Sequence, residues 1–164
     1  DIATAVCALR HVLHGTDETL KEARQLMPVP TYDHARTYLT VGERDLATAE
    51  QERIAMAQDI YNRRAFDALF HAARQASMAF LNTDNTRWGE VRRSLPSPFD
   101  ARFKRLIDTL HVQYAYDGRY PADRVEEEFR TWRSEVEQFI ADLETASAPA
   151  TPAAPAGVPP PSAP

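Results

Sequence analysis

The chain has 164 residues, a formal net charge of −5 and a single cysteine, Cys7. The length favours one domain with its own core, the lone cysteine excludes an intramolecular disulfide, and the acidic charge excludes a global basic field that would attract nucleic acid or an anionic membrane. No apolar run reaches the roughly 18 residues that a membrane-spanning helix needs, and the start lacks the layout of a signal peptide, so we expect a cytoplasmic protein without membrane contact.

Residues 1–30 are expected to form an N-terminal helical hairpin and a linker. An apolar stripe runs from Ile2 to Leu13, Gly15 ends this first helix, and a second short helix reaches Met27. Pro28-Val29-Pro30 then makes a stiff, extended connector.

Two antiparallel helices are predicted for the next segment. The stretch from Tyr32 to Tyr61 contains no proline and only Gly42 as a weak point, which predicts one long amphipathic helix. Asn62 is predicted as the turn, after which a helix from Arg63 to Leu81 runs back.

The helix predicted over residues 63–81 is the centre of the expected bundle. Its alanines favour helix and let neighbouring backbones come close. Its large apolar and small residues recur at i, i+3, i+4 and i+7, so one broad face is expected to be buried: Phe66, Leu69, Phe70, Ala73, Ala76, Ser77 and Phe80.

Two further helices are predicted after a polar loop. Trp88–Ser94 forms a short helix, and Ser97 with Pro98 has the pattern of an N-cap followed by the first helical residue. The helix that starts there keeps its apolar residues in register to Tyr114. Gly118 is expected to end it in a left-handed conformation.

The last helix is predicted to open at Pro121 and to pack along a stripe with steps of four and three: Val125, Phe129, Trp132, Val136, Phe139 and Leu143. Part of this stripe either packs in the core or serves as a surface for a partner. Residues 145–164 are rich in alanine and proline and are predicted to be a disordered tail. The predicted units are therefore 1–30, 31–144 and 145–164, and the predicted fold is an all-α, antiparallel four- to five-helix bundle.

Established catalytic and cofactor motifs are missing from the sequence. His11 and His14 share a helix face but have no local third ligand, which argues against a metal site. Cys7 lies on a predicted apolar helix where the sequence demonstrates no basic activation of the thiol, and the isolated glycines form no phosphate-binding loop. The acidic run Glu126–Glu128 suits the first turn of the last helix. We therefore predict neither a metal nor another cofactor.

Arginine and histidine remain as the residues that a metal-free ribonuclease needs. A neutral imidazole takes the proton from a ribose 2′-hydroxyl, and a guanidinium stabilises the charged state at phosphorus. Two pairs have a fitting spacing, Arg64 with His71 and Arg105 with His111. Each histidine can equally be a residue at the rim of the core whose ring nitrogen is bonded locally.

The segment Arg64-Ala65-Phe66-Asp67-Ala68-Leu69-Phe70-His71-Ala72-Ala73 resembles the Ala-Tyr-Tyr-Ala-x-Phe-His-Ala-Ala signature of HEPN domains, the higher eukaryote and prokaryote nucleotide-binding domains. The run from Tyr116 to Asp123 is similar to the Arg-x-x-Ala-Asp-Tyr motif of small stand-alone HEPN proteins. The resemblance covers residues 32–143 and implies a bundle of four or five helices that is commonly dimeric.

The resemblance also implies where catalysis would reside. In active members, an Arg-x4-6-His motif at the start of the last helix forms a ribonuclease site across the dimer. Arg119 takes the arginine position here, but no histidine follows His111 in the sequence. His71 matches a family position that is structural or at the rim more often than it is the base, and Phe66-Asp67 replaces the family's tyrosine pair.

Three functional hypotheses remain open at this point. The first is a HEPN-like, non-catalytic binding or regulatory protein that acts with a partner such as a nucleotidyltransferase in a toxin-antitoxin or phage-defence system. Such a protein would form a homodimer or bind this second protein, and RNA or a nucleotide would be a further ligand. The second is a metal-independent endoribonuclease toxin whose site combines Arg119, Arg64 and His71 across a dimer. The third is a structural helical domain of a larger assembly.

Overall fold

The computed structural model describes residues 30–148, which form five helices packed together without a β-strand. Helix α2 spans Tyr32–Gln51, α3 spans Ala55–Phe80 and α4 spans Trp88–Ser94. Helix α5, Phe99–Leu106, continues directly into the π-helix η1, Ile107–Tyr116, and α6 spans Val125–Ser147. The prediction of an all-α bundle is confirmed for these residues. The predicted N-terminal hairpin, with Cys7, His11 and His14, lies outside them, as does the tail beyond residue 148.

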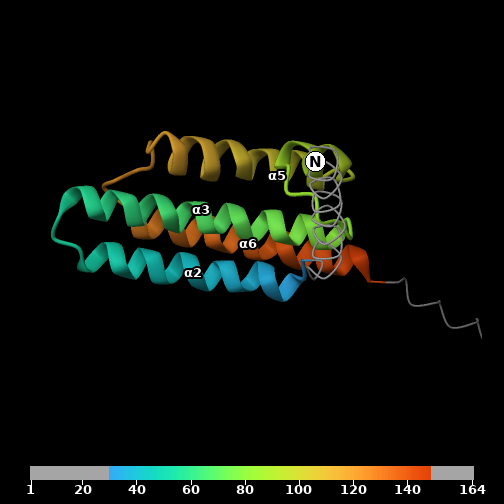
Figure 1. Cartoon of the computed structure of the whole chain (residues 1–164), viewed down its shortest axis with the longest axis horizontal. Helices are drawn as coiled ribbons and strands as arrows, with labels where there is room; N and C mark the ends of the chain where they lie inside the picture. Colours follow the sequence, from blue (N-terminus) through green and yellow to red (C-terminus); the bar gives the residue numbers. More distant parts are fainter. Residues whose placement is uncertain (1–29, 149–164) are drawn as a thin grey trace, which may run out of the picture.

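Helix α3 is the central element of the bundle and contacts each of the other helices between residues 30 and 148. Figure 1 shows α2 and α3 as an antiparallel pair joined by a tight turn, with α5 and η1 along the other side of α3 and α6 packed beside it. This arrangement follows from the sequence of α3, because its alanines let several helices approach one axis closely. Six of the seven residues predicted for its buried face are buried: Phe66, Leu69, Phe70, Ala73, Ala76 and Ser77.

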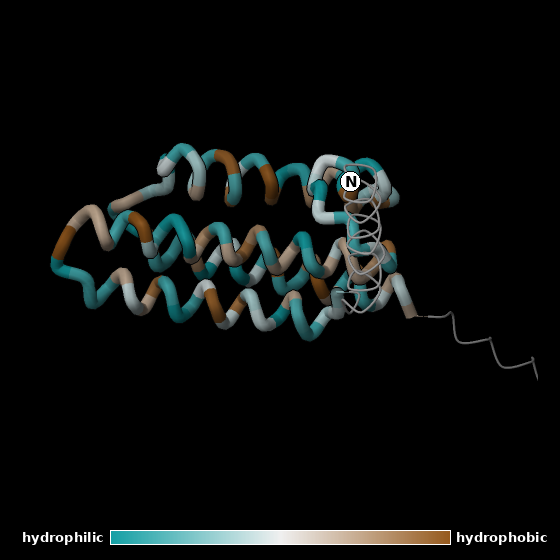
Figure 2. Tube along the Cα trace, viewed as in Figure 1, coloured by the Kyte–Doolittle hydropathy of each residue, from teal (hydrophilic) through white to brown (hydrophobic). Residues whose placement is uncertain are grey.

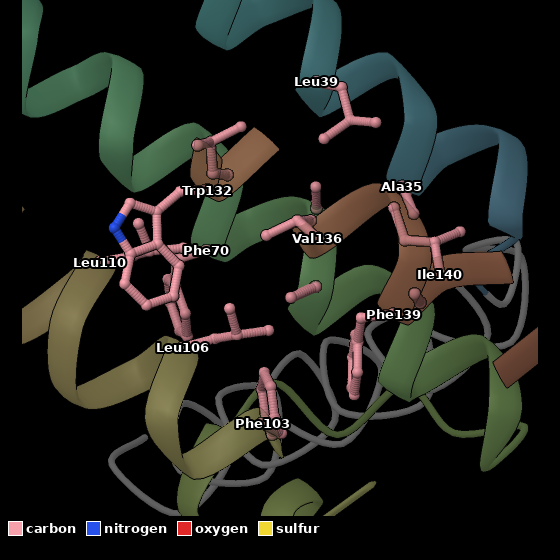
Figure 3. Close-up of a cluster of buried hydrophobic side chains, with 14 of the residues drawn as sticks. Ala35, Leu39, Phe70, Phe103, Leu106, Leu110, Trp132, Val136, Phe139 and Ile140 are labelled. Carbon is pink, nitrogen blue, oxygen red and sulfur yellow. The ribbon is translucent and has the colours of Figure 1, made fainter. Parts of the chain in front are cut away.

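The core is filled by side chains from α2, α3, α5, η1 and α6. Figure 3 shows Leu39, Phe70, Phe103, Leu110 and Val136 pointing into one shared interior. Phenylalanine rings from different helices meet there, with 6.2 Å between the ring centroids of Phe103 and Phe139. Such contacts bury the large apolar groups that the helical spacing predicts.

The predicted stripe on the last helix is buried within the chain itself from Phe129 to Leu143, and Val125 at its start is partly buried. Phe129, Trp132 and Phe139 all belong to the core, so the alternative of a partner surface on their part of the stripe is wrong. Glu128 reinforces this packing, because one of its carboxylate oxygens accepts hydrogen bonds from the Tyr114 hydroxyl at 2.6 Å and from Trp132 Nε1 at 2.8 Å. Helix α6 is therefore fixed against η1 by apolar and polar contacts.

The predicted turn at Asn62 is wrong. The first long helix ends at Gln51, Glu52 and Ile54 have extended backbones, and α3 begins at Ala55. Asn62 is buried inside α3, where its side-chain nitrogen approaches the Tyr120 hydroxyl at 3.5 Å. The break carries neither proline nor glycine, which is why the local sequence did not reveal it.

Three helix ends also differ from the prediction. Ser97 does not cap α5: the helix starts at Phe99, and the backbone nitrogen of Phe99 donates to the Pro96 carbonyl at 2.9 Å instead. Helix α6 opens at Val125 after a short turn and not at Pro121, and it runs to Ser147, past the predicted tail boundary at residue 145. Backbone hydrogen bonds in the turns before α5 and α6 take the place of the predicted starts at Ser97 and Pro121.

Two glycines allow close approaches. A Cβ atom on Gly42 would lie 3.1 Å from the Ala65 carbonyl oxygen and 3.2 Å from the Phe129 ring, so the predicted weak point of α2 is a packing contact with α3 and α6. Gly118 has a φ of 68°, as predicted, and a side chain there would overlap the Arg63 guanidinium. Arg63 also donates to the Tyr116 carbonyl at 3.3 Å, which ties the loop after η1 to α3.

None of the helices between residues 30 and 148 combines the length and the apolar character that crossing a membrane requires.

Candidate functional site

One carboxylate on α3 holds two histidines. Asp67 Oδ1 lies 2.7 Å from Nδ1 of His111 on η1, and Asp67 Oδ2 lies 3.2 Å from Nε2 of His71, one turn further along α3. The three side chains are all about one-third exposed, so the cluster lies at the edge of the core and not inside it. We call Asp67, His71 and His111 the Asp–His cluster.

The pKa of Asp67 is lowered by its two partners. Burial alone would raise this pKa, but the hydrogen bonds from His71 and His111, together with their charge when protonated, outweigh it. Asp67 therefore stays a carboxylate at neutral pH and can orient both rings.

The two histidines differ in what their second nitrogen can do. Nδ1 of His71 is buried and has no hydrogen-bond partner within the described part of the chain, and the ring lies between Tyr38 and Phe70 with centroid distances of 5.6 and 5.3 Å. A nitrogen in that position cannot reach a substrate, which fits the interpretation of His71 as a rim residue of the core.

His111 differs from His71 in that its second ring nitrogen is not buried. It stacks on Phe70 at 4.4 Å between centroids and meets the edge of Trp88 at 6.3 Å. Its Nδ1 is bound to Asp67, whereas its Nε2 makes no hydrogen bond with residues 30–148 and is not among their buried unpartnered atoms. A carboxylate on one nitrogen and a free second nitrogen is the arrangement of a general base.

Arg64 and His71 line one shallow cavity of about 190 Å³ between α2 and α3. The Arg64 guanidinium is held at 3.3 Å from Asp45, a buried carboxylate of α2, and lies 5.3 Å from the centre of the Tyr61 ring. The structure thus brings two of the three predicted site residues together, although the guanidinium is already paired with a carboxylate.

Arg119 lies elsewhere. It belongs to the exposed loop between η1 and α6, its guanidinium pairs with Asp117, and its backbone nitrogen donates to the Gln113 carbonyl at 2.8 Å. No contact links it to Arg64 or His71 within residues 30–148. The composite site of Arg119, Arg64 and His71 is therefore not assembled within one chain.

The second predicted pair, Arg105 with His111, is also separated. Arg105 bonds to Glu135 at 2.7 Å and lies over the Trp132 ring, while His111 turns to Asp67. Sequence reasoning did not identify Asp67 as the common partner. The i, i+4 spacing of Asp67 and His71 was a usable local signal, but nothing local connects Asp67 with His111.

No group of three or more histidine, cysteine, aspartate or glutamate residues in the part that the structure describes is arranged to hold a metal ion. Comparison with protein-family models, with curated proteins and with solved structures finds no match to this chain.

Proposed function

We propose that this chain is a non-catalytic helical binding or regulatory protein that acts with a protein partner. The observation that supports it most concerns the predicted cation and base that one chain brings together: the Arg64 guanidinium already pairs with Asp45, and Nδ1 of His71 is buried, so neither group is free to act at a phosphate. The resemblance to HEPN domains suggests a nucleotidyltransferase-like partner in a toxin-antitoxin or phage-defence pair.

Exposed apolar side chains support the proposal that this chain binds a protein partner. Ile54, Met56 and Ile60 are 66%, 75% and 49% exposed and project from the end of the bundle where α2 turns into α3. The hydropathy colouring of Figure 2 shows apolar residues at this turn. We call these three residues the apolar end. Grouped exposed apolar residues are typical of protein interaction sites, since each loses contact with water when a partner binds.

The first test combines RNA cleavage with co-purification. We expect the purified full chain, in the presence of a chelator, to leave single-stranded RNA intact and to co-purify with a second chain from its native host. Ile60→Glu should release that chain, because the charge would have to be buried at the contact. Val112→Glu, at an exposed apolar residue of η1, is the matched control and should retain it.

RNA cleavage by the wild-type chain would contradict the proposal and favour a second candidate, a metal-independent endoribonuclease. The observation behind that candidate is the 2.7 Å contact of Asp67 with His111, which orients a ring whose other nitrogen is free. The guanidinium would come from Arg119 of a second copy, since this side chain is 72% exposed. Cleavage lost in both His111→Gln and Arg119→Ala, but kept in His71→Ala, would establish it.

A further inference from the structure

Two cavities, of about 380 and 190 Å³, lie between α2 and α3 and share Tyr38 and Val41 in their linings. The smaller one is the shallow cavity described above. The lining of the two together runs over residues 34–45 on α2 and over residues 64–75 on α3, with steps of three and four that keep to one face of each helix. The cavities therefore form one continuous groove about 16 Å long, which we call the α2–α3 groove.

The α2–α3 groove is not covered by a helix from residues 30–148. Among the described helices, α2 contacts only α3 and α6, and η1 lies against α3 without reaching α2. The side of α2 that faces α6 carries other residues, such as Glu43 and Leu46. The Tyr38 and Val41 side chains are only partly buried, so the groove presents apolar surface of the kind that a further helix normally covers.

We propose that residues 17–27 of the same chain dock in the α2–α3 groove as a helix that runs antiparallel to α2. These residues lie outside the part of the chain that the structure describes, and their sequence predicts a short helix that Pro28 ends. A helix of this length extends about 15 Å, which matches the length of the groove. The inference goes beyond the proposed function, because it concerns a contact within one chain.

The position at which the segment joins the bundle suits this docking. The described residues begin at Pro30, and the groove begins at His34, in the first turn of α2. Packed helices lie about 8–10 Å apart, and the four residues 28–31 span up to about 13 Å when extended. Thr31, the N-cap of α2, has an extended backbone. The connection is therefore long enough for the segment to turn back along α2.

The apolar side chains of the segment fit this register. Leu20, Ala23 and Met27 recur at steps of three and four, so they share one helix face. With Met27 at the entrance of the groove, the antiparallel register places Leu20 beside Val41 and Ala23 opposite Tyr38. The small alanine leaves room for the tyrosine ring, as close packing of two helices requires.

The charge at the far end of the groove favours the same direction. Asp17 precedes Leu20 by three positions on the docking face, so it reaches the end of the groove where Arg64 lies. The Arg64 side chain is 57% exposed and that of its partner Asp45 is 8% exposed, so the guanidinium is the outer charge of the pair. The nearby Asp67 is already bound to two histidines. A guanidinium can accept a second carboxylate as partner, and docking of Asp17 there closes the smaller cavity.

The experiment attaches a nitroxide spin label to Glu18→Cys in the full 15N-labelled chain, with Cys7→Ser so that the label has one site. We expect the backbone amides of Asp45 and Arg64 to be broadened more strongly than that of Ala35, because docking brings residue 18 to the far end of the groove. A segment that is tethered without docking would broaden the amides near Ala35 most. That pattern, or no broadening at the groove, would overturn the proposal.

A matched pair of substitutions tests the face that docks. Leu20→Gln places a polar group against the groove and should lower the docking equilibrium constant, measured from the broadening at Asp45, at least about tenfold. Leu26→Gln makes the same change to the side of that face and should leave the broadening nearly unchanged. Equal effects of the two substitutions would overturn the register. Both lie outside the described bundle, so its remaining amides should keep their positions in the spectrum.

Two further samples identify the segment that occupies the groove. Spin-labelled chains without 15N are mixed with 15N-labelled chains without the spin label, and we expect no broadening at Asp45. Broadening in this mixture as strong as within one chain would overturn docking in the same chain and indicate exchange between two copies. A label on Ala5→Cys should broaden Val41 less than the label at residue 18 does; the reverse order would overturn the choice of residues 17–27.

Discussion

Asp67 links two parts of the bundle through single hydrogen bonds. It lies on α3, and its oxygens reach His71 on the same helix and His111 on η1. This carboxylate fixes the orientation of the His111 ring.

The lowered pKa of Asp67 predicts a pH dependence of stability. Because the folded pKa is below the unfolded value, Asp67 contributes stability above the unfolded pKa, and this contribution is lost as the pH falls through the folded pKa. We expect the free energy of unfolding from urea titrations to fall as the pH is lowered below about 5, and to fall less in Asp67→Asn. Asp84→Asn, in the exposed loop after α3, is the control and should follow the wild type; equal slopes in all three proteins would disprove the role of Asp67.

At the scale of the helices, the sequence predicts which faces are buried better than it predicts where each helix begins and ends. The buried faces of α3 and α6 were predictable because apolar spacing is a local property, as Phe66 and Phe139 show. The break near Ile54 was not, because no proline or glycine marks it and the contact that fixes Asn62 inside α3 comes from Tyr120. A partner that lies 58 positions away in the chain leaves no local pattern.

Two glycine replacements are expected to have opposite effects. Gly42→Ala gains helix propensity but pushes its Cβ against the Ala65 carbonyl oxygen and the buried Phe129 ring, so we expect a net loss of stability. Gly89→Ala in α4 meets nothing closer than 3.9 Å, and we expect a gain of up to about 1 kcal/mol. Thermal and urea unfolding of both variants measure the difference; a stabilised Gly42→Ala would show that α2 and α3 separate easily.

At the scale of the whole molecule, most of the candidate site depends on contacts between distant segments. The sequence identified Arg64, His71 and Arg119 by type and spacing; the first two lie on one face of α3, and the packing of α2 adds the other wall of their cavity. His111 reaches Asp67 across 44 positions, from a π-helix whose register the 3.6-residue period does not predict. The all-α class was predictable because every long segment has helical spacing.

Phe66 is the expected anchor of the whole bundle. It is fully buried, and its ring meets those of Tyr114, Tyr120 and Phe129, which come from η1, the following loop and α6. We expect Phe66→Ala to cost about 3–5 kcal/mol of unfolding free energy in urea titrations, the range for an aromatic residue removed from a core. Phe80→Ala, at the half-buried end of α3, should cost clearly less; equal losses would contradict the central role of Phe66.

Arg63 and Gly118 have a consequence for how this chain can evolve. The guanidinium occupies the space where a side chain of residue 118 would lie, so the loop takes its shape from a residue on α3. A larger residue at 118 would meet both the Arg63 guanidinium and the strain of a positive φ, so a smaller residue at 63 does not by itself make it acceptable. Glycine should therefore persist at 118 even where position 63 varies, and a change at 63 would instead release the Tyr116 carbonyl, which lies 53 positions away in the chain.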